Sequence, residues 1–169
     1  MTEAGFPDAR WGSDSGKLRD VFDAFAATPL GSRCVRALVP LDRRLLSKTK
    51  GRYTVLGPFG YQVLVLTTIG RKSGQRRQSP LIYTRDGDRL YLFGSNFGQT
   101  SHPAWTSNLL ANPDVWVSMG GQEIAVRATR LSGKDYDHAY ELFMNYLKAY
   151  PAYRSRTDRE IRVFALDRR

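Results

Sequence analysis

The sequence has few residues that could form disulfides or metal sites. Cys34 is its single cysteine, and His102 and His138 are its only histidines. One thiol cannot form an internal disulfide, and a structural zinc site usually takes four Cys or His ligands, so neither is predicted. With 169 residues, 41% of them hydrophobic, the chain is long enough for one globular domain stabilised by its own core.

Long apolar helices are also missing from the pattern. The first fifteen residues carry Asp8 and Asp14 and contain no apolar stretch, so no secretory signal is expected. The uncharged run over residues 53–70 is interrupted by Gly57, Pro58 and Gly60, whereas a transmembrane helix needs roughly 20 mostly apolar residues. We therefore expect a cytoplasmic protein.

Acidic residues are absent from one long stretch. From Arg43 to Arg85 the chain has ten Lys and Arg residues and no Asp or Glu, and residues 31–80 account for the whole net charge of +10. Such a concentration of charge attracts nucleic acid, anionic lipid or a phosphorylated cofactor, although a solvated basic face without a partner explains it equally well. The 20 aromatic residues fall in expected core positions rather than among the basic residues, so no nucleic-acid partner is predicted.

Two helical patterns precede the strands. Residues 13–28 have apolar side chains at helical spacing after Ser13, a plausible N-cap, and residues 34–50 form an apolar and basic stretch that Pro40 should break. The cationic side of the second stretch could make a peripheral membrane contact through residues 33–52, or it could simply cover the rest of the protein. Two later helices are expected over residues 101–110 and from Ser132 onward.

Six short segments with the pattern of β-strands follow the second helical segment, residues 34–50. The Asp86-Gly87 and Gly120-Gly121 pairs predict two hairpins, and few helices interrupt the series. A small antiparallel barrel is the architecture that best fits this pattern. The predicted strands cover residues 63–68, 81–84, 90–93, 115–119, 123–129 and 161–166.

The strongest local motif is the basic turn, residues 70–77, with the sequence Gly-Arg-Lys-Ser-Gly-Gln-Arg-Arg. Its glycines would let the main chain turn tightly and expose N–H groups, and its cations would supply charge for a phosphate. Neither G-x-x-x-x-G-K-[ST] nor G-x-G-x-x-G is present, so no nucleotide fingerprint is claimed. An ordinary cationic hairpin is the alternative interpretation.

Two further segments could contribute to a pocket. The glycine-rich residues 94–99 precede a helix that carries Trp105, which offers a flat wall for a ring system, although a Trp in the core explains the same pattern. Tyr150 and Tyr153 could line a pocket or donate a proton, while packing at a rim is the commoner role. No hydrolytic motif is convincing and His102 is not expected to act as a base, so the reactive atoms of an enzyme would belong to a bound cofactor.

At these motifs the sequence resembles the deazaflavin-dependent nitroreductase family, actinobacterial split-barrel proteins that use reduced coenzyme F-420. The resemblance covers roughly residues 60–167. The matching segments are Leu66-Thr67-Thr68-Ile69-Gly70-Arg71-Lys72-Ser73-Gly74-Gln75, Ser79-Pro80-Leu81, Asp86-Gly87, Ser95-Asn96, His102-Pro103-Ala104-Trp105, Asn108-Leu109, Ala111-Asn112-Pro113, Tyr150-Pro151-Ala152-Tyr153 and Thr157-Asp158-Arg159-Glu160-Ile161.

The resemblance implies a mainly β fold with α-helices (α+β), a six-stranded antiparallel split β-barrel with flanking helices. Residues 1–52 would be an N-terminal helical and basic segment covering the barrel, and residues 53–169 would bind the deazaflavin. Tyr153 is implied as a proton donor, with Ser95 beside the reacting ring, and Tyr150 and Tyr153 would face the substrate. The residues implied for cofactor binding are Arg71, Lys72, Ser73, Gly74, Gln75, Arg77, Pro80, Ile82, Ser95, Asn96, Ala104 and Trp105.

The implied function is hydride transfer from reduced coenzyme F-420 to a small electron-poor acceptor such as a quinone, an activated double bond or a nitroaromatic. The alternative is a non-catalytic carrier of coenzyme F-420, or of FMN in the same barrel. Two departures from the family pattern change the expected site: Arg76 stands where proline is common, and Arg154-Ser155-Arg156 replaces a further tyrosine. The sequence does not indicate the oligomeric state.

Overall fold

The computed structural model of the chain describes residues 5–9, 17–148, 150–156 and 158–169, without the side chains of Leu18, Tyr150 and Tyr153. The expected N-cap Ser13 lies outside the described residues. The elements in chain order are α1 (Lys17–Ala27), α2 (Pro29–Lys48), η1 (Gly57–Phe59), β1 (Val63–Ile69), β2 (Arg76–Asp86), β3 (Arg89–Phe93), η2 (Asn96–Gly98), α3 (Ala104–Ala111), β4 (Asp114–Met119), β5 (Gln122–Arg130), α4 (Gly133–Tyr146), α5 (Tyr150–Arg154) and β6 (Val163–Arg168).

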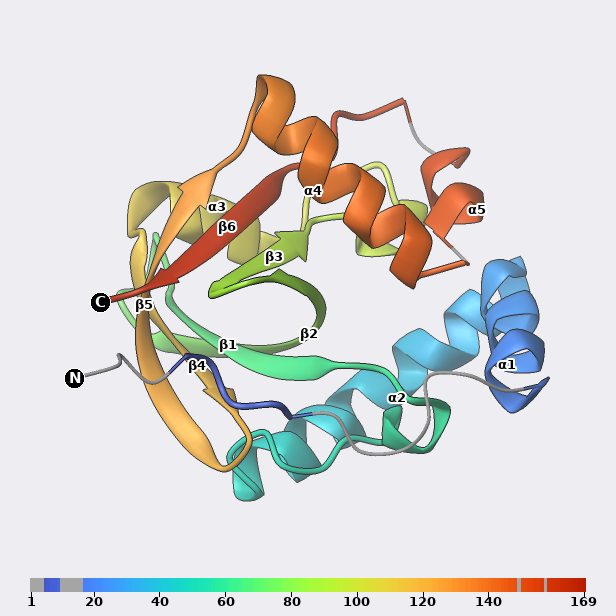
Figure 1. Cartoon of the computed structure of the whole chain (residues 1–169), viewed down its shortest axis with the longest axis horizontal. Helices are drawn as coiled ribbons and strands as arrows, with labels where there is room; N and C mark the ends of the chain where they lie inside the picture. The colour runs from blue at the N-terminus through green and yellow to red at the C-terminus, as the bar shows by residue number, and fades with distance from the viewer. Residues whose placement is uncertain (1–4, 10–16, 149, 157) are drawn as a thin grey trace.

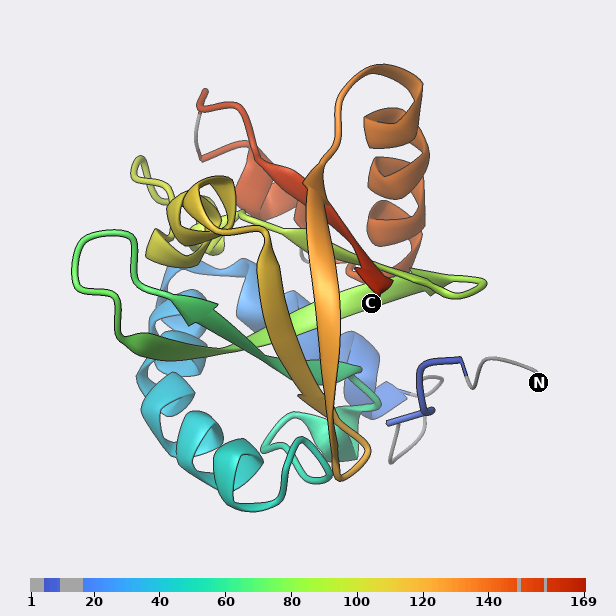
Figure 2. The same cartoon turned by 90° about the vertical axis from the view of Figure 1, so that its left-hand side faces the viewer.

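The six strands form a closed antiparallel barrel in the order β1-β2-β3-β6-β5-β4 (Figures 1 and 2). β1 closes the barrel by pairing with both β2 and β4. The two predicted hairpins are present: Gly87 has φ 56°, and Gly120 and Gly121 have φ 57° and 83°, values that glycine adopts without steric cost. The predicted six-stranded barrel is confirmed.

Successive side chains of the strands point to opposite faces of the sheet, and they form two separate apolar cores. Leu64, Leu66 and Phe164 point into the barrel, where Trp105 of α3 also packs. Val63, Val65 and Phe93 point outward and pack beneath helices α2 and α4. Because successive side chains of a strand point to opposite faces, a run such as β1, buried on both faces, is apolar at nearly every position.

Helix α2 is longer than the sequence predicted and is continuous (Pro29–Lys48). Thr28 caps it by accepting a hydrogen bond from the Gly31 amide at 3.0 Å, and Pro29 occupies the first turn, where its missing N–H costs nothing. The expected break at Pro40 is wrong, because the helix runs through it. Pro40 is exposed, so the helical hydrogen bond that it forfeits lies where water can replace it.

A buried charged cluster attaches α1 to the barrel. The Arg19 guanidinium lies 4.7 Å from the ring centroids of both Tyr61 and Tyr146 and donates to the Tyr146 carbonyl at 2.7 Å. It also pairs with Asp23 at 3.8 Å, and the Tyr61 hydroxyl donates to the same carboxylate. Burial and the neighbouring Asp23 raise the pKa of Tyr61 above its usual value, so its hydroxyl remains a donor.

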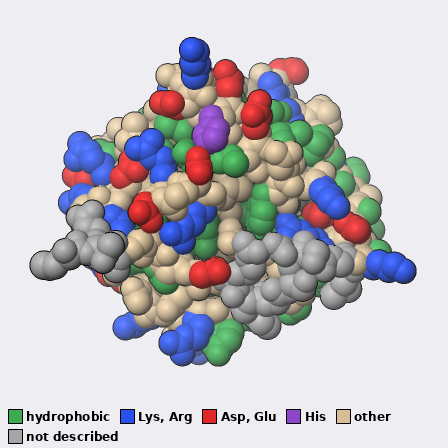
Figure 3. All heavy atoms as spheres, viewed as in Figure 1, with side chains coloured by type: hydrophobic (Ala, Val, Ile, Leu, Met, Phe, Trp, Pro, Cys, Tyr) green, Lys and Arg blue, Asp and Glu red, His purple; other side chains and the backbone are tan. Residues whose placement is uncertain are grey.

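The surface carries charges of both signs. On the face shown in Figure 3, acidic and basic side chains are interspersed. Among the described residues, pairs such as Arg89–Asp167 at 2.7 Å and His138–Asp86 at 2.8 Å join elements distant in sequence. Such exposed pairs contribute little to stability. Within the described ranges, no helix is both long and apolar enough to cross a bilayer.

Candidate functional site

The basic turn, residues 70–77, joins β1 to β2 at one end of the barrel. The Gly70 amide donates to Gln75 O at 2.8 Å, and the Gly74 amide donates to Gly70 O at 2.7 Å. Gly74 has φ 65°, which explains why glycine stands there. Residues 71–77 are exposed, so the charges of Arg71, Lys72 and Arg77 are accessible to a ligand from solvent.

Asn108 of α3 anchors this turn. Its side-chain amide donates to Thr68 Oγ1 at 3.0 Å, while its Oδ1 accepts a hydrogen bond from the Arg71 amide at 3.1 Å. Asn108 and Thr68 are both buried. The sequence motif contained Asn108 but gave it no role, because nothing in the local pattern shows that α3 packs against the end of β1.

The expectation that main-chain amides of the turn are exposed is wrong at four positions. The amides of Gly70, Arg71, Gly74 and Gln75 donate to acceptors within the protein. Gln75 also accepts a hydrogen bond from Arg77 Nη2 at 3.2 Å. An anion at this turn would therefore be held mainly by side chains rather than by a cradle of backbone N–H groups.

Arg76 is turned away from the rest of the turn. Its guanidinium carbon lies 4.3 Å from the centroid of the Trp116 ring, on the strand beyond β1. A guanidinium over an indole is a favourable cation–π contact. The charge that distinguishes this chain from the family pattern is thus held against an aromatic side chain.

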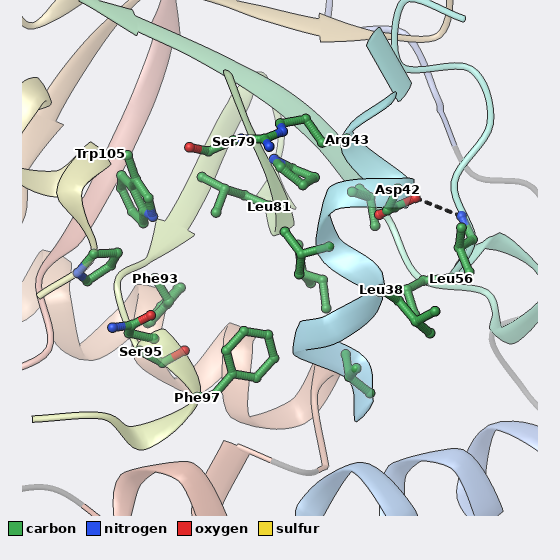
Figure 4. A pocket seen from close by; sticks show the side chains of 18 of the residues that line it. Leu38, Asp42, Arg43, Leu56, Ser79, Leu81, Phe93, Ser95, Phe97 and Trp105 are labelled. Carbon is green, nitrogen blue, oxygen red and sulfur yellow. Dashed lines mark hydrogen bonds between the residues drawn. The ribbon is translucent and has the colours of Figure 1, made fainter. Parts of the chain in front are cut away.

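A cavity of about 300 Å³ opens where the sheet splits. β2 pairs with β1 over residues 76–82 but with β3 only over residues 83–86, so the first half of β2 and the end of β3 diverge. Figure 4 shows Ser79 and Leu81 on one side of the opening, and Phe93, Ser95, Phe97 and Trp105 around it. The lining is mostly apolar, which is the usual composition of a small-molecule site.

Helix α2 forms the opposite wall of the cavity. Its residues Val35, Leu38, Val39, Asp42 and Arg43 are among those that line the cavity. In Figure 4 the Asp42 carboxylate points toward the loop that carries Leu56. The sequence predicted only that this segment covers the barrel, and it missed these residues as site components. Its amphipathic pattern showed that one face was buried but not what the face would contact.

Asp42 ties α2 to the loop at the far end of the cavity. Its Oδ1 accepts hydrogen bonds from the Val55 amide at 2.8 Å and the Thr54 hydroxyl at 2.9 Å. Burial raises the pKa of Asp42 above its usual value and outweighs these two hydrogen bonds, which act in the opposite direction. Ionisation of Asp42 therefore lowers the free energy of unfolding, and this loss grows as the pH rises and more of the carboxyl group is ionised.

Replacing Asp42 by asparagine tests that cost. The Asp42→Asn variant keeps an acceptor for Val55 and Thr54 but cannot ionise, so its free energy of unfolding should exceed that of the wild type at pH 8. The difference should shrink as the pH falls toward the ordinary aspartate pKa of 3.8, because the raised folded pKa favours the protonated form. Urea unfolding across this pH range measures it. Asp42→Ala should lose about 1–3 kcal/mol, and an asparagine variant that follows the wild-type pH dependence would contradict the assignment.

The structure gathers part of the site predicted from the sequence in this cavity. Pro80, Ile82, Ser95, Asn96 and Trp105 all line it. Ala104, the first residue of α3, is exposed and is not among the lining residues.

The remaining predicted residues lie elsewhere or outside the description. Arg71, Lys72, Ser73, Gly74, Gln75 and Arg77 belong to the basic turn, outside the cavity but on the chain that leads directly into it. Tyr150 and Tyr153 belong to the short helix α5, and their side chains lie outside the described part of the structure.

The fold and the site together define a class of protein. A split β-barrel with a cationic turn beside an apolar cavity is suited to hold an anionic redox cofactor. A family model described as F420H(2)-dependent quinone reductase matches residues 38–168, and the chain belongs to this family. It is an F420H(2)-dependent reductase with coenzyme F-420 as its cofactor, as the resemblance implied.

Individual relatives agree with this membership. An F420H(2)-dependent quinone reductase of Mycobacterium tuberculosis is 36% identical over 135 residues, which are 78% of this chain and 91% of that protein. The structure of an F420-H2 dependent reductase matches with a TM-score of 0.58 and 32% identity, covering 62% of this chain and 93% of that one. A structure described as a domain-swapped dimer matches with a TM-score of 0.61 and 29% identity, covering 80% and 98%.

Proposed function

We propose that this protein transfers a hydride from reduced coenzyme F-420 to a quinone bound in the cavity beside Trp105. The observation that carries the proposal is the placement of both halves of the site on one strand. β2 begins at the basic turn and continues into the cavity wall at Ser79–Ile82. From Arg77 to Leu81 an extended chain spans roughly 13 Å, so a ligand with an anionic tail and an apolar ring could contact both.

The residues present fit such a cofactor. Arg71, Lys72 and Arg77 offer charge-assisted hydrogen bonds to phosphate and carboxylate groups, with Ser73, Gly74 and Gln75 completing the turn. Pro80 and Ile82 would flank the polyol, and Ser95, Asn96 and Trp105 would bound the ring. Ala104 is exposed and outside the cavity lining, so the structure gives no support to the ring contact that the resemblance implied for it. The cavity of about 300 Å³ has the size and the apolar lining that a fused ring system needs.

The bound deazaflavin would supply a hydride, and the protein would supply position, exclusion of water and a proton. Trp105 and Phe97 present apolar surface to the reacting rings, and the helix α2 wall limits access of water. We assign proton donation to the Tyr153 hydroxyl, with Ser95 beside the ring and Tyr150 at the acceptor. Activated double bonds and nitroaromatics are further acceptors of the same chemistry.

A titration followed by an acceptor panel tests this function. Purified protein should bind coenzyme F-420 more tightly than FMN, and addition of a naphthoquinone should oxidise the reduced coenzyme, measured by recovery of its absorbance. Binding without acceptor-dependent oxidation would instead support the alternative, a non-catalytic carrier. FMN binding that is tighter than coenzyme F-420 binding in this titration would overturn the choice of cofactor.

We also propose that residues 33–52 make a peripheral contact with anionic membranes. Leu41 is 56% exposed and outside the cavity lining, and it stands among the exposed cations Arg33, Arg36 and Arg44. An apolar and cationic surface of this kind suits a lipid headgroup region. Leu41→Ser should reduce co-sedimentation with phosphatidylglycerol vesicles about fivefold, whereas Leu110→Ser, on α3, should not. An equal reduction of vesicle co-sedimentation in Leu41→Ser and Leu110→Ser would contradict the proposal.

A further inference from the structure

The site loop, residues 94–99, joins β3 to α3 and carries Ser95, Asn96 and Phe97 into the cavity wall. Two of its residues have left-handed backbone conformations: Asn96 has φ 50° and Phe97 has φ 55°. Asparagine tolerates this region, but a bulky aromatic residue disfavours it. Such a conformation persists only where the surrounding structure imposes it, so the site loop needs an external support.

Arg159, on the segment before β6, supplies that support. Its Nη2 donates to the carbonyl oxygens of Ser95 at 3.0 Å and Gly94 at 3.2 Å, and it also reaches Gln99 O at 3.4 Å. Its Nε donates to the same Gln99 carbonyl at 3.4 Å. One planar guanidinium thus contacts both ends of the site loop, a geometry that a flexible ammonium group cannot reproduce.

His102 holds the other side of the same guanidinium. Arg159 Nη1 lies 2.9 Å from His102 Nδ1, and because arginine only donates, this nitrogen must be an acceptor and the ring neutral. Burial, followed by the nearby charges of Arg162 and Arg159, lowers the pKa of His102, and Arg130 acts in the same direction. Glu160 is the acidic group that opposes them. The neutral ring can therefore keep Arg159 oriented at physiological pH.

We propose that Arg159 is the positioning residue of the cavity, holding the site loop in its left-handed geometry so that Ser95 and Phe97 remain at the wall. His102 is the second anchor of the guanidinium. An effect of Arg159 on catalysis rests on the proposed function. The restraint of the site loop by Arg159 does not, because it involves only contacts within the protein. Tail binding at the basic turn does not depend on it, because that turn is anchored separately by Asn108.

Hydrogen exchange measures the restraint without any ligand. The amides of Gly98 and Gln99 donate within the loop at 3.0 Å each, to Ser95 O and Asn96 O, so their exchange reports its opening. Arg159→Met should accelerate exchange at these two amides by about tenfold or more, and Arg159→Lys should give an intermediate rate. The amides of Gly70 and Gly74 in the basic turn should be unaffected.

Arg162→Met is the matched control. It removes an equal charge close to His102, but the Arg162 side chain contacts Thr106 and Ser107 rather than the site loop. Equal acceleration in this control, or unchanged exchange in Arg159→Met, would overturn the proposal. If Arg159→Met fails to fold, the Arg159→Lys variant still decides, because wild-type exchange in that variant would also overturn it.

The loaded enzyme gives the second readout. Arg159→Met should lower kcat with a naphthoquinone by about 100-fold, since small displacements of reacting groups have effects of this size. The affinity for coenzyme F-420 should fall less, and its dependence on salt should match that of the wild type, because the basic turn is intact. Wild-type kcat with accelerated exchange would overturn the catalytic role. If the wild-type protein shows no turnover at all, the proposed function is wrong. The hydrogen-exchange experiment still tests whether Arg159 restrains the site loop.

Discussion

Replacing Lys72 and Arg77 by alanine should weaken coenzyme F-420 binding by about fivefold to tenfold each at low salt. Both side chains are exposed at the basic turn, where each would contribute one charge-assisted contact to an anionic tail. The loss should diminish as sodium chloride is raised from roughly 20 mM to roughly 500 mM, because screening weakens these contacts in the wild type as well. Fluorescence titration of the coenzyme at several salt concentrations measures both effects.

Lys134→Ala provides the control for charge alone. Lys134 is exposed in the first turn of α4, away from the basic turn in sequence, and its removal lowers the net charge by the same amount. Its affinity should remain within about twofold of the wild type. Wild-type affinity at low salt in both Lys72→Ala and Arg77→Ala would show that the tail is held elsewhere.

Removing the Asp23 carboxylate should cause the largest loss of stability. Asp23→Ala removes the carboxylate that pairs with Arg19, a residue only 7% exposed, and that accepts the hydrogen bond of the Tyr61 hydroxyl. Breaking one side of a buried pair of this kind costs about 3–5 kcal/mol. Urea unfolding followed by circular dichroism should show the loss, and Tyr61→Phe should show a smaller one, about 1–3 kcal/mol.

A second aspartate on the same helix is the control for this prediction. Asp20 also forms an ion pair, with Lys148 at 2.6 Å, but both partners are largely exposed. Asp20→Ala should therefore cost less than about 1 kcal/mol. Equal destabilisation by the two alanine variants would mean that α1 is held by its charge or helicity rather than by the buried cluster.

Local patterns were sufficient to predict the barrel. Short apolar runs rich in β-branched residues, together with the Asp86-Gly87 and Gly120-Gly121 turns, indicate the strands and their hairpins without reference to distant contacts. The continuous helix through Pro40 could not be predicted in this way, because an interior proline disfavours a helix locally, and the packing of α2 against the rest of the protein is not visible in the sequence.

The residues that line the cavity could be predicted only where they lie in one contiguous motif, and their roles toward the cofactor stay predictions. The basic turn and the residues around Trp105 are such motifs, and the resemblance to a family made their grouping visible. Asp42 and Asn108 were not predicted, since their roles depend on the packing of α2 and α3 against strands far away in the chain. Arg159 lay within a quoted motif, but its contacts with residues 94–99 arise only in the folded barrel.

Strand β2 carries both the end of the basic turn and one wall of the cavity, so it would set the length of a ligand that spans the proposed site. Peptide geometry, rather than the packing of a movable helix, fixes the interval between the cationic end and the hydrophobic end. One inserted residue would exchange Leu81 and Ile82 between the barrel interior and the face under the helices, whereas two would preserve the faces and lengthen the interval by roughly 7 Å. Redesign of this enzyme for longer or shorter cofactors would therefore have to proceed in steps of two residues.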